Sequence, residues 1–113
     1  MSDLIKIAVD AMGGDNAPKK IINGIIHNHR HYKNNFFIIF GKEKEIIPHI
    51  NNKIDKKFYK IVNTENYVKS TDSPLEAAKK GKDTSMWLAI ESVKNKEADI
   101  VISAGNTGAL LVI

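Results

Sequence analysis

Two glycine-rich turns, each directly after a short β-rich segment, constrain the fold of this chain most. AMGGDNAP at 11–18 follows the segment 4–10, and SAGNTGA at 103–109 follows the segment 99–103. In an open parallel sheet, ligands bind beyond the carboxyl ends of the strands. Glycine permits positive φ and lets backbone N–H groups approach an anion, and the N-terminal end of a following helix is positive. We therefore expect both turns on one rim of a sheet, where they suit a phosphate-like group.

The remaining hydrophobic pattern alternates between strands and helices. The apolar run at 36–40 has the length of a strand buried on both faces, and 58–62, which Lys60 interrupts, is a further strand candidate. Helices are predicted at 18–32, at 42–50 with Pro48 limiting it, at 73–81 after a capping box, from 83 onward and from 109 onward. The order β-α-β-α-β-α-α-β-α predicts an α/β fold with right-handed crossovers and a mainly parallel sheet covered on both faces.

The length of the chain bounds what it can contain. Its 113 residues, 42% of them hydrophobic and 27% charged, fit one soluble globular domain. A chain of this size buries a core, but a large catalytic cleft would have to be shared with another part. The last helical segment has only begun at Ile113 and has no C-cap. We expect residues 1–113 to be the N-terminal part of a single α/β catalytic domain that is truncated at Ile113.

The absence of cysteine excludes disulfides, thiolate zinc sites and a cysteine nucleophile. It also favours a reducing, cytoplasmic location. Near the N-terminus, Asp3, Lys6 and Asp10 interrupt the apolar residues. Neither a signal peptide nor a membrane span is therefore predicted there.

The charge balance is basic, with 17 Lys and Arg against 13 Asp and Glu, and Arg30 is the single arginine. Arginine is the usual residue for bidentate reading of bases and phosphates, so the composition argues against a nucleic-acid partner. The lysines lie mainly at 42–60 and 79–82, without the aromatic interleaving of single-strand binders. They indicate either a solvated surface or attraction to an acidic partner or anionic substrate.

Neither glycine-rich turn has a nucleotide-binding signature. No Gly-Lys-Ser/Thr follows, as a Walker A loop requires, and the spaced three-glycine dinucleotide fingerprint is absent. Strand-to-helix turns also need glycine for steric reasons alone, so that interpretation stays open for each turn. The donors of Ser103, Asn106 and Thr107 beside Gly105 favour an anion, because no carboxylate competes there.

The histidines offer a metal-site alternative. His27 and His31 are four apart on a predicted helix, which is the spacing of two ligands of one metal. They lie off the apolar face and no acidic third ligand is evident, so we interpret them as solvated and expect no metal. His29 lies on the apolar side of the same helix and is expected to pack against the protein.

Three longer motifs make the sequence similar to a known family. IAVDAMGGDNAP at 7–18, KGKDTSM at 80–86 and ADIVISAGNTGALL at 98–111 resemble the phosphate acyltransferase family, PlsX, of bacterial phospholipid biosynthesis. The motifs come in the family's order. The resemblance covers the whole chain but only the front part of a family member.

The resemblance implies an enzyme that converts acyl-[acyl carrier protein] and inorganic phosphate to acyl phosphate and free carrier protein, without a cofactor. It implies a three-layer α/β/α fold similar to isocitrate/isopropylmalate dehydrogenases and phosphotransacetylases, usually as a homodimer with the site near the subunit contact. Family members are cytoplasmic and associate peripherally with the membrane, where a glycerol-3-phosphate acyltransferase uses the product. The 113-residue fragment alone is expected to be inactive.

The residues expected to carry the chemistry lie in the three motifs. The catalytic candidates are Asn106 and Lys82. The expected phosphate- and substrate-binding residues are Gly13, Gly14, Asp15, Ser85, Ser103, Gly105, Thr107 and Gly108. Those at 103–108 are expected to cradle the phosphate or the oxyanion, and those at 13–15 to form the opposing loop.

Two carboxylates and one tryptophan fit this picture less simply. Asp10 and Asp15 repel a phosphate, so we expect them to cap loops, to bind Lys82 or to handle a proton. Thr84 stands where family members usually have a serine, which keeps a hydroxyl. Trp87 stands near the place of a basic residue, which leaves open whether that helix face meets solvent, another subunit or an acyl chain.

Two alternatives from other classes remain at this point. The fold class also contains nucleotide-dependent dehydrogenases and kinase-like enzymes, although the absent fingerprints count against them. The 113 residues are also compatible with a folding module that has no turnover of its own.

Overall fold

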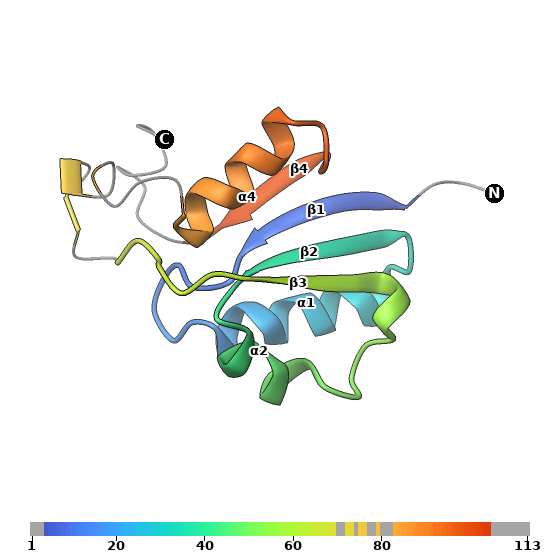
Figure 1. Cartoon of the computed structure of the whole chain (residues 1–113). Coiled ribbons are helices and arrows are strands. Elements are labelled where there is room, and N and C mark those ends of the chain that lie inside the picture. The colour runs from blue at the N-terminus through green and yellow to red at the C-terminus, as the bar shows by residue number, and fades with distance from the viewer. Residues whose placement is uncertain (1–3, 70–71, 74, 77–78, 80–82, 105–113) are drawn as a thin grey trace.

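The computed structural model describes residues 4–69, 72–73, 75–76, 79 and 83–104. Their strands are β1 (Ile5–Asp10), β2 (Asn35–Gly41), β3 (Tyr59–Asn63) and β4 (Ile100–Ser103). Their helices are α1 (Lys19–His31), α2 (Glu43–Ile50), the short 3-10 helix η1 (Lys56–Phe58) and α4 (Ser85–Lys94) (Figure 1). The four strands lie where the hydrophobic pattern predicts them. The turn at 105–108 and the helix expected from 109 lie outside the described residues.

The four strands are parallel, in the order β3-β2-β1-β4. The chain adds β1, β2 and β3 in one direction and then crosses back to place β4 on the other side of β1. In an open parallel sheet, such a reversal opens a crevice at the carboxyl ends of the two strands beside it. Here those two strands are β1 and β4, which precede the two glycine-rich turns. The predicted parallel sheet is confirmed.

Helices cover both faces of this sheet (Figure 1). On one face, the isoleucines of α1 and α2 pack against alternate residues of β1 and β2; the buried members of this cluster are Ile7, Val9, Ala11, Ile22, Ile25, Ile26, Phe37, Ile39, Ile46, Ile50 and Ile54. Ile22, Ile39 and Ile46 are fully buried, and each such burial contributes about 1.5–3 kcal/mol of transfer free energy. On the other face, Ala89 of α4 packs in the cluster of Ala8 and Phe40.

Side-chain caps set where two predicted helices begin. The Oγ1 of Thr84 accepts from the N–H of Trp87 at 3.2 Å, so α4 starts at Ser85 rather than at Asp83. The Oγ of Ser73 accepts from the N–H of Glu76 at 3.2 Å, as the predicted capping box requires. Pro48 lies inside α2 rather than at its end, and α2 ends two residues later. None of the described helices is long and apolar enough to cross a membrane.

Candidate anion site at the carboxyl ends of β1 and β4

The last residues of β1 and β4 are neighbours in the sheet. Asp10 is the register partner of Ser103, and the Oγ of Ser103 donates to the Oδ2 of Asp10 at 3.0 Å. The turns that follow are also in contact, because a Cβ at Gly14 would lie 2.7 Å from the carbonyl oxygen of Ala104. Gly14 has φ +87°, a conformation that favours glycine. The two turns therefore meet on one rim, as the sequence predicts, as far as residue 104.

Asp10 is the centre of the hydrogen bonding at this rim. Its side chain is 1% exposed. Its Oδ1 accepts from the hydroxyl of Ser85 at 2.6 Å and from the N–H of Met12 at 3.1 Å, while its Oδ2 accepts from Ser103. One carboxylate thus joins the first turn, the end of β4 and the first residue of α4.

Two features lower the free-energy cost of burying the carboxylate of Asp10. Three donors satisfy it, and hydrogen bonds to a charged group are stronger than neutral ones. Because Ser85 is the first residue of α4, Asp10 also lies at the positive end of that helix. The bond to Met12 confirms that Asp10 caps its loop.

The other predicted site residues divide by burial. Gly13 is buried, Gly14 is half-buried and Asp15 is exposed, so the first turn runs from the core to the surface. Ser85 is fully buried and donates to Asp10, so in this structure it supports the carboxylate from inside the protein. Ser103 is half-buried at the rim. The other candidates lie outside the described residues: Lys82, Gly105, Asn106, Thr107 and Gly108.

Sequence reasoning missed the central place of Asp10. It assigned Asp10 to loop capping, to a lysine or to a proton, but not to two serines that lie 75 and 93 residues away. The available signal was an acidic residue at the end of a buried strand and directly before a glycine turn. Such a residue lacks room to reach water and needs partners from other elements.

The histidines of α1 are placed as expected. His27 and His31 are exposed and contact each other, with ring centroids 4.8 Å apart. Among the residues that the structure describes, no group of three or more His, Cys, Asp or Glu side chains suits a metal ion. His29 is buried with its ring 4.7 Å from that of Phe58, and this burial lowers its pKa.

Trp87 lies on the half-buried side of α4. Its Nε1 donates to the Oε2 of Glu91 at 3.3 Å, one turn further along the helix. Its indole is therefore held along α4.

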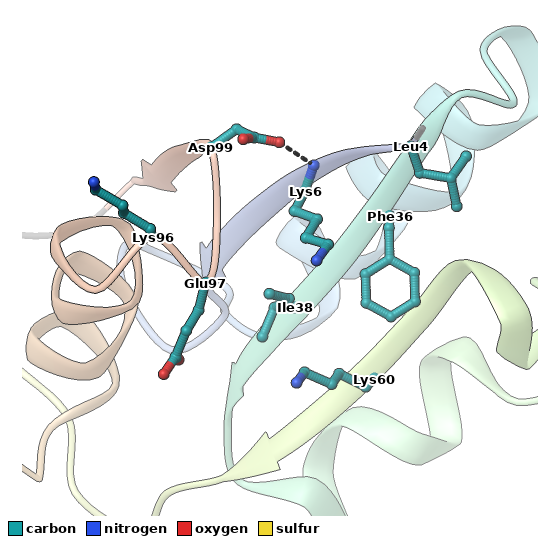
Figure 2. A pocket seen from close by; sticks show the side chains of 8 residues that line it. All are labelled: Leu4, Lys6, Phe36, Ile38, Lys60, Lys96, Glu97 and Asp99. Atoms are coloured by element: carbon teal, nitrogen blue, oxygen red, sulfur yellow. Dashed lines mark hydrogen bonds between the residues drawn. The ribbon is translucent and has the colours of Figure 1, made fainter. Parts of the chain in front are cut away.

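A hollow of about 750 Å³ lies at the opposite, amino-terminal end of the sheet (Figure 2). Phe36 and Ile38 of β2 form its floor, and Lys6 and Lys60 extend beside them from the adjacent strands. Asp99 forms part of its wall and accepts from the backbone N–H of Lys6 at 2.8 Å. Among the described residues, none of either glycine-rich turn lines this hollow, so its size does not make it the phosphate site. The paired turns at the carboxyl ends remain the candidate.

Comparison with known proteins identifies the family. A family described as "Fatty acid synthesis protein" matches residues 5–113. The chain belongs to this fatty acid synthesis protein family.

Named relatives of this family member are phosphate acyltransferases. That of Pelagibacter ubique is 63% identical over 113 residues, which are 100% of this chain and 34% of the relative. Those of Listeria innocua and Enterococcus faecalis are 48% and 47% identical over 107 residues, 95% of this chain and 31% of each relative. The resemblance to the phosphate acyltransferase family is confirmed. The chain spans about a third of the length of these curated relatives.

Proposed function

We propose that the whole protein is a phosphate acyltransferase that transfers an acyl group from acyl carrier protein to inorganic phosphate. The observation that carries this proposal is the contact of the two glycine-rich turns, at Gly14 and Ala104, where the strand order reverses. That is the place where an open parallel sheet binds ligands. The names of the relatives supply the reaction.

The reaction asks two things of the site. An oxygen of hydrogenphosphate attacks the thioester carbon, the C–O bond forms, the C–S bond breaks, and the phosphate proton ends on the carrier-protein thiol. Phosphate is itself the nucleophile, so no acyl-enzyme intermediate is required. The site must hold phosphate against the carbon, where orientation lowers the barrier by about 7–11 kcal/mol, and it must stabilise the developing oxyanion.

We assign these tasks to the two turns. The second turn forms the cradle for the phosphate or the oxyanion, with the residues Ser103, Gly105, Asn106, Thr107 and Gly108. The first turn forms the opposing loop, with Gly13 to Asp15. Asn106 donates its amide to the developing charge, and Lys82 supplies a cation. Asp10 holds the first turn against the end of β4, which the three bonds to its carboxylate support.

The proposal extends to the fold and setting of the whole protein. We propose a three-layer α/β/α domain of the isocitrate/isopropylmalate dehydrogenase type that continues beyond this chain. Ile100 and Ile102 are 47% and 48% exposed on β4, the edge strand of the described sheet, and exposed apolar residues on such a strand support further structure there. We further propose a cytoplasmic homodimer that associates with the membrane peripherally and supplies acyl phosphate to a glycerol-3-phosphate acyltransferase.

The test is phosphate-dependent consumption of an acyl-carrier-protein thioester by the intact gene product, with acyl phosphate as the measured product. The 113-residue fragment is assayed beside it and is expected to show no turnover. Thermal stabilisation of the intact protein by nucleotides, with none by phosphate and no thioester loss, would replace this proposal by a nucleotide-dependent enzyme.

A further inference from the structure

A groove of about 370 Å³ lies between α1 and β4, on the face of the sheet that α1 covers. Its floor includes Val9 and Ile102, which are register partners on adjacent strands. One wall is the side of α1 that carries Ile21, Gly24 and Ile25. Gly24 is exposed and Ile102 is 48% exposed, so this α1–β4 groove is open to the surface.

The α1–β4 groove begins beside the rim that carries the candidate anion site. Val9 and Ile102 are the last residues but one of β1 and β4. On α1, Lys20 lines this end of the groove, and its backbone N–H donates to the carbonyl oxygen of Asn16 in the first turn at 3.0 Å. From there α1 runs back toward the amino ends of the strands, and Asn28 lines the groove about 12 Å further along the helix. The groove therefore leads away from the rim along α1.

Gly24 keeps the middle of the helical wall open. Nothing lies within 4 Å of a Cβ added at this position. The φ of Gly24 is not positive, so the backbone of α1 does not require glycine here, and alanine would make the helix more stable. What glycine provides at this position is free space beside the floor of the groove.

We propose that the α1–β4 groove binds the acyl chain of the substrate, with the thioester carbonyl at the rim and the hydrocarbon tail along α1. The proposal rests on the proposed function, whose substrate carries such a chain. The volume of the groove lies in the range of about 300–1,000 Å³ that small-molecule sites have. Each methylene group that leaves water for these apolar side chains strengthens binding by up to about fourfold.

An extended acyl chain suits the α1–β4 groove better than a packed helix does. One turn of an α-helix with its side chains, about 10 Å wide and about 5.4 Å long, occupies about 420 Å³, which is more than the whole groove. A helix could place only a row of side chains in it, whereas an acyl chain fills it along its length. The charge also matches, because Lys20 lies at the rim end and forms no ion pair with a described residue, and the phosphate that attacks the thioester is an anion.

The experiment fills the groove at Gly24 in the intact enzyme and compares a long with a short substrate. Gly24→Leu places a side chain in the open space about 6 Å along α1 from Lys20. We expect kcat/KM for the hexadecanoyl thioester of the carrier protein to fall at least about tenfold, and that for the butanoyl thioester to stay at the wild-type value, because the short chain ends before Gly24. The melting temperature should not fall, since leucine is a better helix former than glycine. Asn23→Leu is the matched control: Asn23 is exposed on the same helix and does not line the groove, so the ratio of the two kcat/KM values should not change.

A second measurement locates the acyl chain in the wild-type enzyme and needs no variant. The intact protein is mixed with a hexadecanoyl thioester of the carrier protein that bears a diazirine in the middle of its chain, and the sample is irradiated. Mass spectrometry of the digested protein identifies the labelled residues. We expect the label on the side of α1 that carries Ile21, Gly24 and Ile25, or on Ile102 of β4. Unlabelled hexadecanoyl thioester in excess should remove it.

The outcomes separate the two proposals. An intact protein that forms no acyl phosphate from either thioester overturns the proposed function. An active enzyme that is labelled on neither α1 nor β4 overturns only the inference, as does a Gly24→Leu enzyme with the wild-type ratio of kcat/KM values. A lower melting temperature in Gly24→Leu, with equal losses for both thioesters, would mean that another part of the intact protein or a second copy fills the groove, and it would also overturn the inference. The labelling of the wild-type enzyme decides the matter even if Gly24→Leu does not fold.

Discussion

Gly14 packs directly against the backbone carbonyl of Ala104. A Cβ at position 14 would lie 2.7 Å from the carbonyl oxygen of Ala104, so no side chain fits there. The two residues lie in turns far apart in the sequence, and they meet because β1 and β4 are adjacent parallel strands. Glycine at this position thus serves a close approach between two backbones as well as a positive φ. Both needs can be tested by one substitution.

Gly14→Ala should destabilise the protein by about 1–3 kcal/mol, because alanine is strained at φ +87° and its Cβ would overlap a backbone atom that cannot move aside cheaply. Urea unfolding of the purified protein measures this. Gly24→Ala is the control. Gly24 lies within α1 with nothing within 4 Å of an added Cβ, so the change should stabilise by about 0.5–1 kcal/mol. Equal stability of the two variants would contradict the contact.

Asp10→Ala should cost about 2–3 kcal/mol of unfolding free energy, because the N–H of Met12 and the hydroxyls of Ser85 and Ser103 lose their acceptor. The serines can turn toward other acceptors, but the N–H cannot. Asp15→Ala, at an exposed carboxylate in the next turn, should stay within about 0.5 kcal/mol of wild type. Chemical denaturation of the pair gives the comparison, and similar losses at both positions would mean that the network contributes little.

The position of both turns at one edge of the sheet was predictable, because it depends only on local sequence patterns and on the order of strands and helices. Strand candidates that alternate with helical patterns predict a mainly parallel sheet, and parallel strands bring their following turns to one edge. That reasoning predicts 11–18 and the start of 103–109 on the same rim, and the contact at Gly14 agrees. The adjacency of β1 and β4, which brings the two turns into contact, was not predicted. No knowledge of side-chain packing was needed.

The partners of Asp10 were not predictable in the same way. The hydrogen bond from Ser85 to Asp10 depends on where α4 crosses the sheet and on the rotation of its first turn. The hydrophobic periodicity of the sequence determines neither the crossing point nor the rotation. The 3-10 helix at Lys56–Phe58 was missed for a different reason, since Asp55 caps it through one side-chain bond to Lys57. The hollow of Figure 2 arises where α4 leaves the start of β2 uncovered, which is again a matter of helix placement.

His29 should make stability depend on pH. Burial, and then repulsion from Lys33, lower its pKa below 6.5 against the opposing attraction of Asp55. The unfolded state therefore binds the proton more readily, so this contribution to stability is present above pH 6.5 and is lost as the pH falls through that value toward the folded pKa. Unfolding free energies between about pH 7.5 and about pH 5.5 should decline.

His29→Phe isolates that contribution. Phenylalanine keeps the ring contact with Phe58 and removes both the proton site and the Nδ1 that has no hydrogen-bond partner among the described residues. The decline in unfolding free energy over the same pH interval should become shallower in His29→Phe and stay unchanged in His27→Gln, whose wild-type side chain is exposed. A decline as steep in His29→Phe as in wild type would assign the pH dependence to other groups.

Asn106→Ala should lower kcat/KM for phosphate in the intact enzyme by about 100- to 1000-fold, which is the usual cost of removing one donor to a developing oxyanion. Gly105→Val should be similarly damaging, because a branched side chain would obstruct the approach of an anion to the backbone. Asn95→Ala, at the exposed end of α4, is the matched control and should leave turnover at the wild-type level. Acyl-phosphate formation and the melting temperature are measured together, since a site residue should change the first far more than the second. Wild-type turnover in Asn106→Ala would remove its amide from the proposed chemistry.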